Sequence, residues 1–201
     1  MSIEFNYKML HSVRRTNLHV CNHAYIESER HMSHNKLGSA ASASRSLQPT
    51  ETNPLDFVPD KIPFDIPYGP PISLDRALSV IYSAVAEATK RNWKMNVAVV
   101  DSGGNLVAFQ RMDGAMLASI QIAEHKARAA ATFRRPTKIF EDGIQLMHLN
   151  YLLAFDGVIA SRGGIPLIDQ GVIMGAIGCS GGTDSQDEIV SKEGAAVINR
   201  T

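Results

Sequence analysis

The side chain in this sequence with the most versatile chemistry in a patterned context is His125, which lies in the run AEHKA. An imidazole either coordinates a metal ion or transfers a proton near neutral pH. On a helix, His125 falls away from the stripe formed by Ala127, Ala130 and Ala131, so it faces a pocket, a subunit interface or solvent. We therefore predict that His125 is a metal ligand or, together with Glu124, a proton-transfer group.

Cationic side chains lie in the same part of the sequence, in elements that we expect to converge at one edge of a sheet. Guanidinium groups hold carboxylates in a two-pronged manner, which favours a small anionic ligand. Glycine allows close approach of the backbone to such a ligand. The residues predicted to bind it are Arg111, Lys126, Arg128, Arg162, Gly163 and Gly164.

Other polar residues have simpler interpretations. Arg134 and Arg135 are expected to pair with Glu141 and Asp142 across the turn at Pro136. His148 is a reserve candidate for metal ligation. Cys179 is expected to pack in the core, because no histidine and acid that would activate it can be identified. The glycine loop at residues 178–183 lacks the lysine of a P-loop, which argues against a nucleotide site.

The elements that must position these residues are two hairpins and several helices. The first hairpin has apolar arms at 97–100 and 106–109 around DSGGN, and the second has arms at 165–168 and 172–177. Pro166 places its arm at a sheet edge or on a bulge. Apolar spacing predicts helices at 73–92, where Ser73 is the N-cap, and at 117–135, which Pro136 ends. A short helix is predicted from Thr137 to Asp142, and a last one after residue 184.

Composition narrows the class of partner. The 201 residues are 44% hydrophobic and carry twenty basic and twenty acidic side chains, so no net charge favours nucleic acid or an anionic membrane. No apolar run approaches the length of a membrane span. The two cysteines are too few for a disulfide framework and indicate a reducing compartment, so we expect a cytoplasmic protein.

The N-terminal third differs from the rest. Residues 1–50 show no stable period and hold five of the seven histidines, but no acidic or cysteine partners complete a metal site. Residues 39–50 have the composition of a linker, and residues 54–71 are a proline-rich strap. We predict an arm at 1–67, partly disordered, and one domain at 68–201.

The motifs YGPPISLDRA, VAVVDSGGNLVAFQRMDGA, KARAAATFRRPTKIFED, GGIPL and GVIMGAIGCSGG occur in order between Tyr68 and Ile198. Together they resemble the GlcG/HbpS-like family, also called the haem-degrading or PduO C-terminal-like domain family. The resemblance implies a profilin-like α/β fold, with an antiparallel sheet of about five strands flanked by helices. It also implies homodimers and higher oligomers such as octamers, and exposed apolar surface on the alanine-rich helix and the strap favours self-association.

Two classes of function remain open, because members of this family differ in activity. The first is a protein that binds haem or a related tetrapyrrole in a subunit-interface pocket, with His125 on the iron; no CxxCH motif is present, so the haem would be noncovalent. The alternative is a lyase of aromatic catabolism that acts on a small anionic substrate such as a hydroxylaminobenzoate, with His125 and Glu124 as acid/base groups and an arginine carboxylate clamp. Arg162 stands where the family has an acidic residue before Gly-Gly-(Leu/Ile)-Pro, which makes the expected pocket rim more basic.

Overall fold

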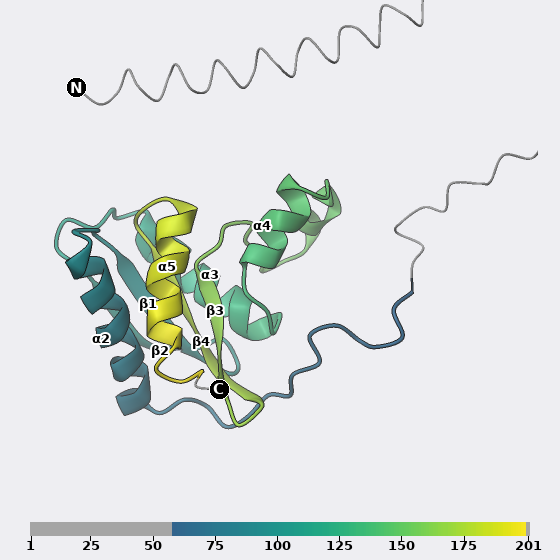
Figure 1. Ribbon diagram of the computed structural model, residues 1–201, viewed down its shortest axis with the longest axis horizontal. Helices are drawn as coiled ribbons and strands as arrows, with labels where there is room; N and C mark the ends of the chain where they lie inside the picture. Colours follow the sequence, from purple (N-terminus) through teal and green to yellow (C-terminus); the bar gives the residue numbers. More distant parts are fainter. Residues whose placement is uncertain (1–57, 200–201) are drawn as a thin grey trace, which may run out of the picture. The chain divides into compact units, whose positions relative to one another are not determined.

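The computed structural model describes residues 58–199 of the chain (Figure 1). The predictions for the histidine-containing arm and the linker lie outside these residues. The described elements are α2 (Leu74–Lys90), β1 (Asn96–Asp101), β2 (Leu106–Arg111), α3 (Ser119–Thr132), α4 (Lys138–Gln145), the 3-10 helix η2 (Asn150–Ala154), β3 (Gly164–Asp169), β4 (Val172–Ser180) and α5 (Asp184–Ala195). Within residues 58–199, no helix is long and apolar enough to span a bilayer.

The four strands form one sheet in the order β2-β1-β4-β3, and every neighbouring pair is antiparallel. The predicted α/β class with an antiparallel sheet and flanking helices is confirmed, with four strands rather than about five. The strap adds only an isolated bridge between Tyr68 and Ile173. Pro67, Pro70 and Pro71 have no N–H to donate, so the strap cannot extend this bridge into a strand.

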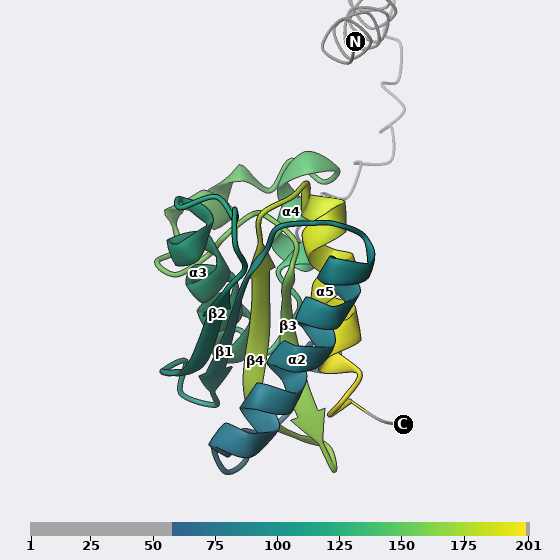
Figure 2. The same cartoon turned by 90° about the vertical axis from the view of Figure 1, so that its left-hand side faces the viewer.

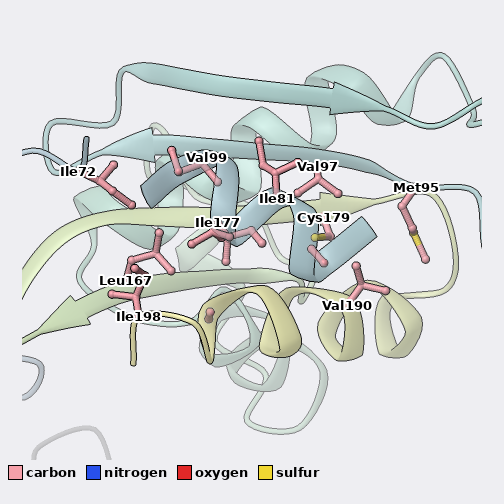
Figure 3. Close-up of a cluster of buried hydrophobic side chains, with 14 of the residues drawn as sticks. Ile72, Ile81, Met95, Val97, Val99, Leu167, Ile177, Cys179, Val190 and Ile198 are labelled. Carbon is pink, nitrogen blue, oxygen red and sulfur yellow. The ribbon is translucent and has the colours of Figure 1, made fainter. Parts of the chain in front are cut away.

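Helices cover both faces of the sheet, as the side view in Figure 2 shows, with α3 on one face and α2 and α5 on the other. Side chains alternate along β1, so Val97 and Val99 join the core under α2 and α5, while Ala98 and Val100 join the core under α3. This explains why β1 is apolar almost throughout. Figure 3 shows the larger of the two cores, in which side chains of α2 and α5, such as Ile81 and Val190, pack with side chains of the sheet, such as Val97 and Cys179.

The helix α3 lies very close to the sheet because the residues between them are small. A Cβ on Gly178 of β4 would lie 2.1 Å from the carbonyl oxygen of Ala123, so only glycine fits there. The sheet-facing side of α3 consists mainly of alanines, including Ala123, Ala127 and Ala130, each with no exposed surface. The close approach holds the backbone of α3, and hence residues 124–128, in a fixed position over β4.

The predicted element boundaries are close to the observed ones. Ser73 caps α2 and its hydroxyl accepts a hydrogen bond from the Arg76 N–H at 3.4 Å, as predicted. Pro166 lies in β3 at the sheet edge, also as predicted. Thr137 precedes α4, but its hydroxyl accepts from the Gly164 N–H at 2.9 Å instead of capping the helix. Thr137 therefore connects α4 to the first residue of β3.

Candidate functional site

The predicted site residues on α3 lie on different sides of the helix. Glu124 and His125 are half-buried on the side away from the sheet, whereas Lys126 is buried. The side-chain hydrogen bonds made by α3 come from Lys126, Arg128 and Thr132. Within residues 58–199, neither Glu124 nor His125 has a hydrogen-bond or ion-pair partner.

The Lys126 ammonium group is inside the protein, in an ion pair with Asp187 of α5. Its Nζ lies 2.7 Å from Asp187 Oδ2, and the two side chains are 1% and 3% exposed. The other oxygen, Oδ1, accepts from the Gly182 N–H at 3.0 Å. Burial raises the pKa of Asp187, against the influence of Lys126 and of the Gly182 N–H. Lys126 thus joins helices from opposite faces of the sheet.

The glycines of the GGIPL motif make room for this ion pair. Gly163 has a φ of +116°, and a Cβ there would lie 2.9 Å from Asp187 Cβ and 3.3 Å from Lys126 Nζ. A Cβ on Gly164 would lie 2.3 Å from the carbonyl oxygen of Lys126. The space above both glycines is therefore filled by protein atoms. Packing around the Lys126–Asp187 pair accounts for the two glycines without a ligand.

Arg162 was expected at the rim of a ligand pocket, but its side chain contacts acidic residues of its own chain. Its Nε lies 2.9 Å and 3.0 Å from the two oxygens of Glu141, and its backbone N–H donates to the same carboxylate at 2.8 Å. Glu188 of α5 lies 3.4 Å from the Arg162 Nη1 atom. Hydrogen bonds from Arg162 hold the pKa of Glu141 below its ordinary value, and the same contacts raise the pKa of Arg162. This cation binds the segment before β3 to α4 and α5.

The expected pairing of Arg134 and Arg135 with Glu141 and Asp142 is wrong. Glu141 forms its ion pair with Arg162, and Arg134 and Arg135 instead contact the strap. Arg134 donates to the carbonyl oxygen of Ile66 at 3.3 Å, and Arg135 lies 4.0 Å from the centroid of the Phe64 ring. Arg134 has a φ of +56°, so the chain turns away at the end of α3 and both side chains point to the strap.

The remaining predicted cations, Arg111 and Arg128, are exposed and lie at opposite ends of β2. Arg111 is the last residue of β2, opposite Asn96. Arg128 donates from Nε to the carbonyl oxygen of Gly104 at 3.2 Å, in the turn before β2. The structure therefore does not bring the predicted cations together at one edge. Arg128 is the one placed on the same helix as Glu124 and His125.

Sequence reasoning missed Asp187 as the partner of Lys126. A signal was present, because Lys126 is three residues after Ala123 and four before Ala130, within the alanine stripe. A lysine in such a stripe indicates a buried charge that requires a counter-ion. The packing interpretation of Cys179 is supported: burial raises the pKa of its thiol to about 12, so the sulfur stays protonated and unreactive at neutral pH.

The described residues include two histidines, His125 and His148, as candidate metal ligands. Residues 58–199 contain no group of three His, Cys, Asp or Glu side chains able to hold a metal ion. Haem iron requires at most two protein ligands, because the porphyrin supplies four nitrogens.

The fold and these residues define a protein of the HbpS-like family. The model of the family described as haem degrading protein HbpS-like matches residues 72–196, and the chain belongs to this family. Protein GlcG of Escherichia coli strain K12 is 38% identical over 109 residues, which are 54% of this chain and 81% of GlcG.

Two solved structures have the same fold. A crystal structure of HbpS has a TM-score of 0.61 and 29% identity, covering 68% of this chain and 96% of HbpS. A crystal structure of a PduOC–haem complex has a TM-score of 0.58 and 26% identity, covering 64% of this chain and 96% of PduOC. These relatives support a haem-related binding function for the family to which the chain belongs.

Proposed function

We propose that this protein binds haem or a related tetrapyrrole noncovalently, with His125 as the axial ligand, in a pocket that a second subunit completes. The observation that carries the proposal is the position of His125, half-buried on the outer side of α3 with no partner within residues 58–199. The rigid packing of α3 against Gly178 supports it, because an axial ligand must be held in place. The haem complex of the relative PduOC supports the ligand class.

The surroundings of His125 suit the two ends of a haem. Arg128 is exposed, and among residues 58–199 its only hydrogen-bond partner is Gly104, at Nε, so its terminal guanidinium nitrogens could bind a propionate carboxylate. A half-buried imidazole can be enclosed further by apolar surface from a second subunit, which would exclude water from the iron. Bound haem would supply redox chemistry at its iron.

The test is a titration of the purified protein with haemin, followed by absorption spectroscopy. We expect a saturable shift of the Soret band in the wild type. In His125→Ala the shift should disappear, or the Kd for haemin should rise about tenfold or more, which corresponds to about 1.4 kcal/mol. His148→Ala is the matched control, because His148 is exposed on the segment between α4 and η2. An unchanged Soret shift in His125→Ala, with loss in His148→Ala, would assign the iron to His148 and overturn the proposal.

A lyase is the second candidate, and the observation that favours it is Glu124 beside His125, also half-buried and unpartnered within the described residues. A carboxylate and an imidazole in the same place can move protons between substrate atoms. Arg128 would then hold the substrate carboxylate. The discriminating result is the absence of a haemin-dependent spectral change together with turnover of 4-hydroxylaminobenzoate that is lost in Glu124→Gln and His125→Ala.

A further inference from the structure

The two edges of the sheet differ in how their backbone groups are satisfied. At the β3 edge, the residues whose N–H and C=O groups point outward are Gly164, Pro166 and Ile168. Thr137 bonds both groups of Gly164, at 2.9 Å and 3.0 Å. The side chain of Asn199 accepts from the Ile168 N–H at 2.7 Å and donates to the Pro166 carbonyl oxygen at 2.9 Å. Proline has no N–H, so this edge offers little to another strand.

The β2 edge carries outward groups with no such cover. The Met112 N–H donates to the Met95 carbonyl oxygen at 3.0 Å, which sets the alternation of hydrogen-bonded pairs along β1 and β2. By this alternation, Gln110 and Ala108 bond to β1, while the N–H and C=O groups of Phe109 and Arg111 point away from it. Within residues 58–199, no group bonds to these outward amides and carbonyls. Figure 2 shows β2 as the outermost strand on its side of the sheet.

We propose that the β2 edge is an interface between two copies of this chain, in which the β2 strands pair antiparallel with Gln110 on the twofold axis. This register sets Phe109 of each copy opposite Arg111 of the other, so two pairs are formed and each exchanges both N–H···O bonds. The sheet would become continuous across the two copies. This interface is independent of the assignment of His125.

The bulge in β2 selects this register. The pairing of β1 with β2 shifts between Val99 and Val100, which leaves Val107 as an extra residue on the β2 side. The regular part of the edge is thus confined to residues 108–111. A register centred on Phe109 would set Arg111 against Val107 at the bulge and lose regular hydrogen bonds. Only the register centred on Gln110 uses all the regular outward groups of both strands.

The contact available to Arg111 favours a second copy as the occupant. Arg111 is exposed and forms no ion pair with residues 58–199, and its register partner Asn96 is neutral. In the proposed pairing, each Arg111 guanidinium lies next to the Phe109 ring of the second copy, a cation–π contact that contributes about 0.5–1 kcal/mol at an exposed site. The two arginines are at opposite ends of the paired segment, so like charges are not opposed.

Cysteine cross-linking tests the register directly. Gln110 would face its own copy in a non-hydrogen-bonded pair, where Cα atoms are about 4.5 Å apart and a disulfide can form. In a Cys21→Ser background, mild oxidation of Gln110→Cys should give a covalent dimer on a non-reducing gel, since Cys179 is buried. Gln170→Cys, exposed in the turn between β3 and β4, is the matched control and should remain uncross-linked.

A backbone variant tests the hydrogen bonds. Phe109→Pro removes an outward N–H that takes no part in the β1 ladder, so the fold should persist, whereas Phe109→Ala removes the ring and keeps the N–H. Because one bond is lost in each copy, the dimer dissociation constant of Phe109→Pro should rise about tenfold relative to Phe109→Ala. Analytical ultracentrifugation measures the constant, and circular dichroism checks folding.

The proposal is overturned if the wild-type chain is monomeric at micromolar concentration. It is also overturned if dimers persist while Gln110→Cys does not cross-link, which would place the interface elsewhere. If Phe109→Pro fails to fold, the cross-linking result decides alone.

Discussion

Two ion pairs of this protein, Lys126–Asp187 and Arg162–Glu141, lie close to Gly163 and Gly164 yet differ in depth. The first pair is 1% and 3% exposed, and the second is 21% and 15% exposed. Lys126 Nζ lies 2.7 Å from Asp187 and 3.8 Å from the more exposed Asp184, whereas Arg162 holds Glu141 with two prongs and contacts Glu188 as well. Both cations next to this glycine motif therefore form ion pairs with carboxylates of their own chain.

The depth of each pair determines how its carboxyl group behaves. Burial dominates at Asp187 and raises its pKa, even though a lysine is in contact. Hydrogen bonds from Arg162 dominate at Glu141 and lower its pKa. The same kind of interaction, an acid beside a base, thus shifts two carboxyl groups in opposite directions. The cost of removing water from the charges decides the sign.

The largest effect is expected from breaking the deep pair. Lys126→Met leaves the Asp187 carboxylate buried without its counter-ion, so the free energy of unfolding should fall by about 3–5 kcal/mol. Urea denaturation measures this loss. Adding Asp187→Leu should recover much of it, because no uncompensated charge then remains. Arg128→Met on the same helix is the control and should change stability by less than about 1 kcal/mol; an equally small loss in Lys126→Met would show that the pair is not buried in solution.

A smaller effect is expected at the outer pair. Arg162→Ala should lower the free energy of unfolding by about 1–2 kcal/mol, since Glu141 and Glu188 are partly accessible and can be hydrated. Arg162→Lys should restore part of this loss, because an ammonium cannot make the two-pronged contact. If Arg162→Ala instead leaves stability unchanged and weakens binding of haemin, the predicted ligand clamp at Arg162 is favoured over the structural role.

The smallest effect is the difference in pH dependence. Because the pKa of Glu141 is lowered on folding, its contribution is present above its ordinary value of 4.5 and is lost as the pH falls through the folded value. Because the pKa of Asp187 is raised, its ionisation costs stability as the pH rises from its ordinary value of 3.8 through the folded value.

Urea denaturation of the wild type, Glu141→Gln and Asp187→Asn along an acid series separates the two. On lowering the pH, the stability advantage of the wild type over Glu141→Gln should shrink. As the pH is lowered over the same range, the stability of the wild type relative to Asp187→Asn should rise. Parallel slopes for the two variants would mean that both carboxyl groups have similar surroundings, which contradicts the comparison.

Much of the fold could be predicted because its determinants are local in sequence. The DSGGN turn, the cap at Ser73 and the position of Pro166 at an edge depend on residues close to one another, and all are confirmed. The expectation of about five strands came from the family resemblance, whereas the described residues form four, and the proline-rich strap adds only one isolated bridge. Local patterns do not show whether such a segment finds a neighbouring strand.

The candidate site was harder to predict because its contacts join distant residues. Asp187 lies 61 positions from Lys126, and Glu141 lies 21 positions from Arg162. Charge type alone indicated that each cation required an anion, but not whether the anion was a ligand or a side chain. Whether a cation pairs with a side chain of its own chain depends on how the chain packs around it, and this packing is not visible in the local sequence. The prediction for His125 depended on helical spacing alone, and its outward position agrees with that spacing.

The cover on the β3 edge has a consequence for the order in which the molecule is completed. Asn199 comes after all four strands and α5 in the chain, so a ribosome delivers it later than any residue that it protects. While residues 164–169 are already outside the ribosome, their outward amides lack the Asn199 side chain. Nascent chains should therefore be vulnerable to association through β3 until Asn199 is in place, and an Asn199→Ala chain would retain that vulnerability in the folded protein.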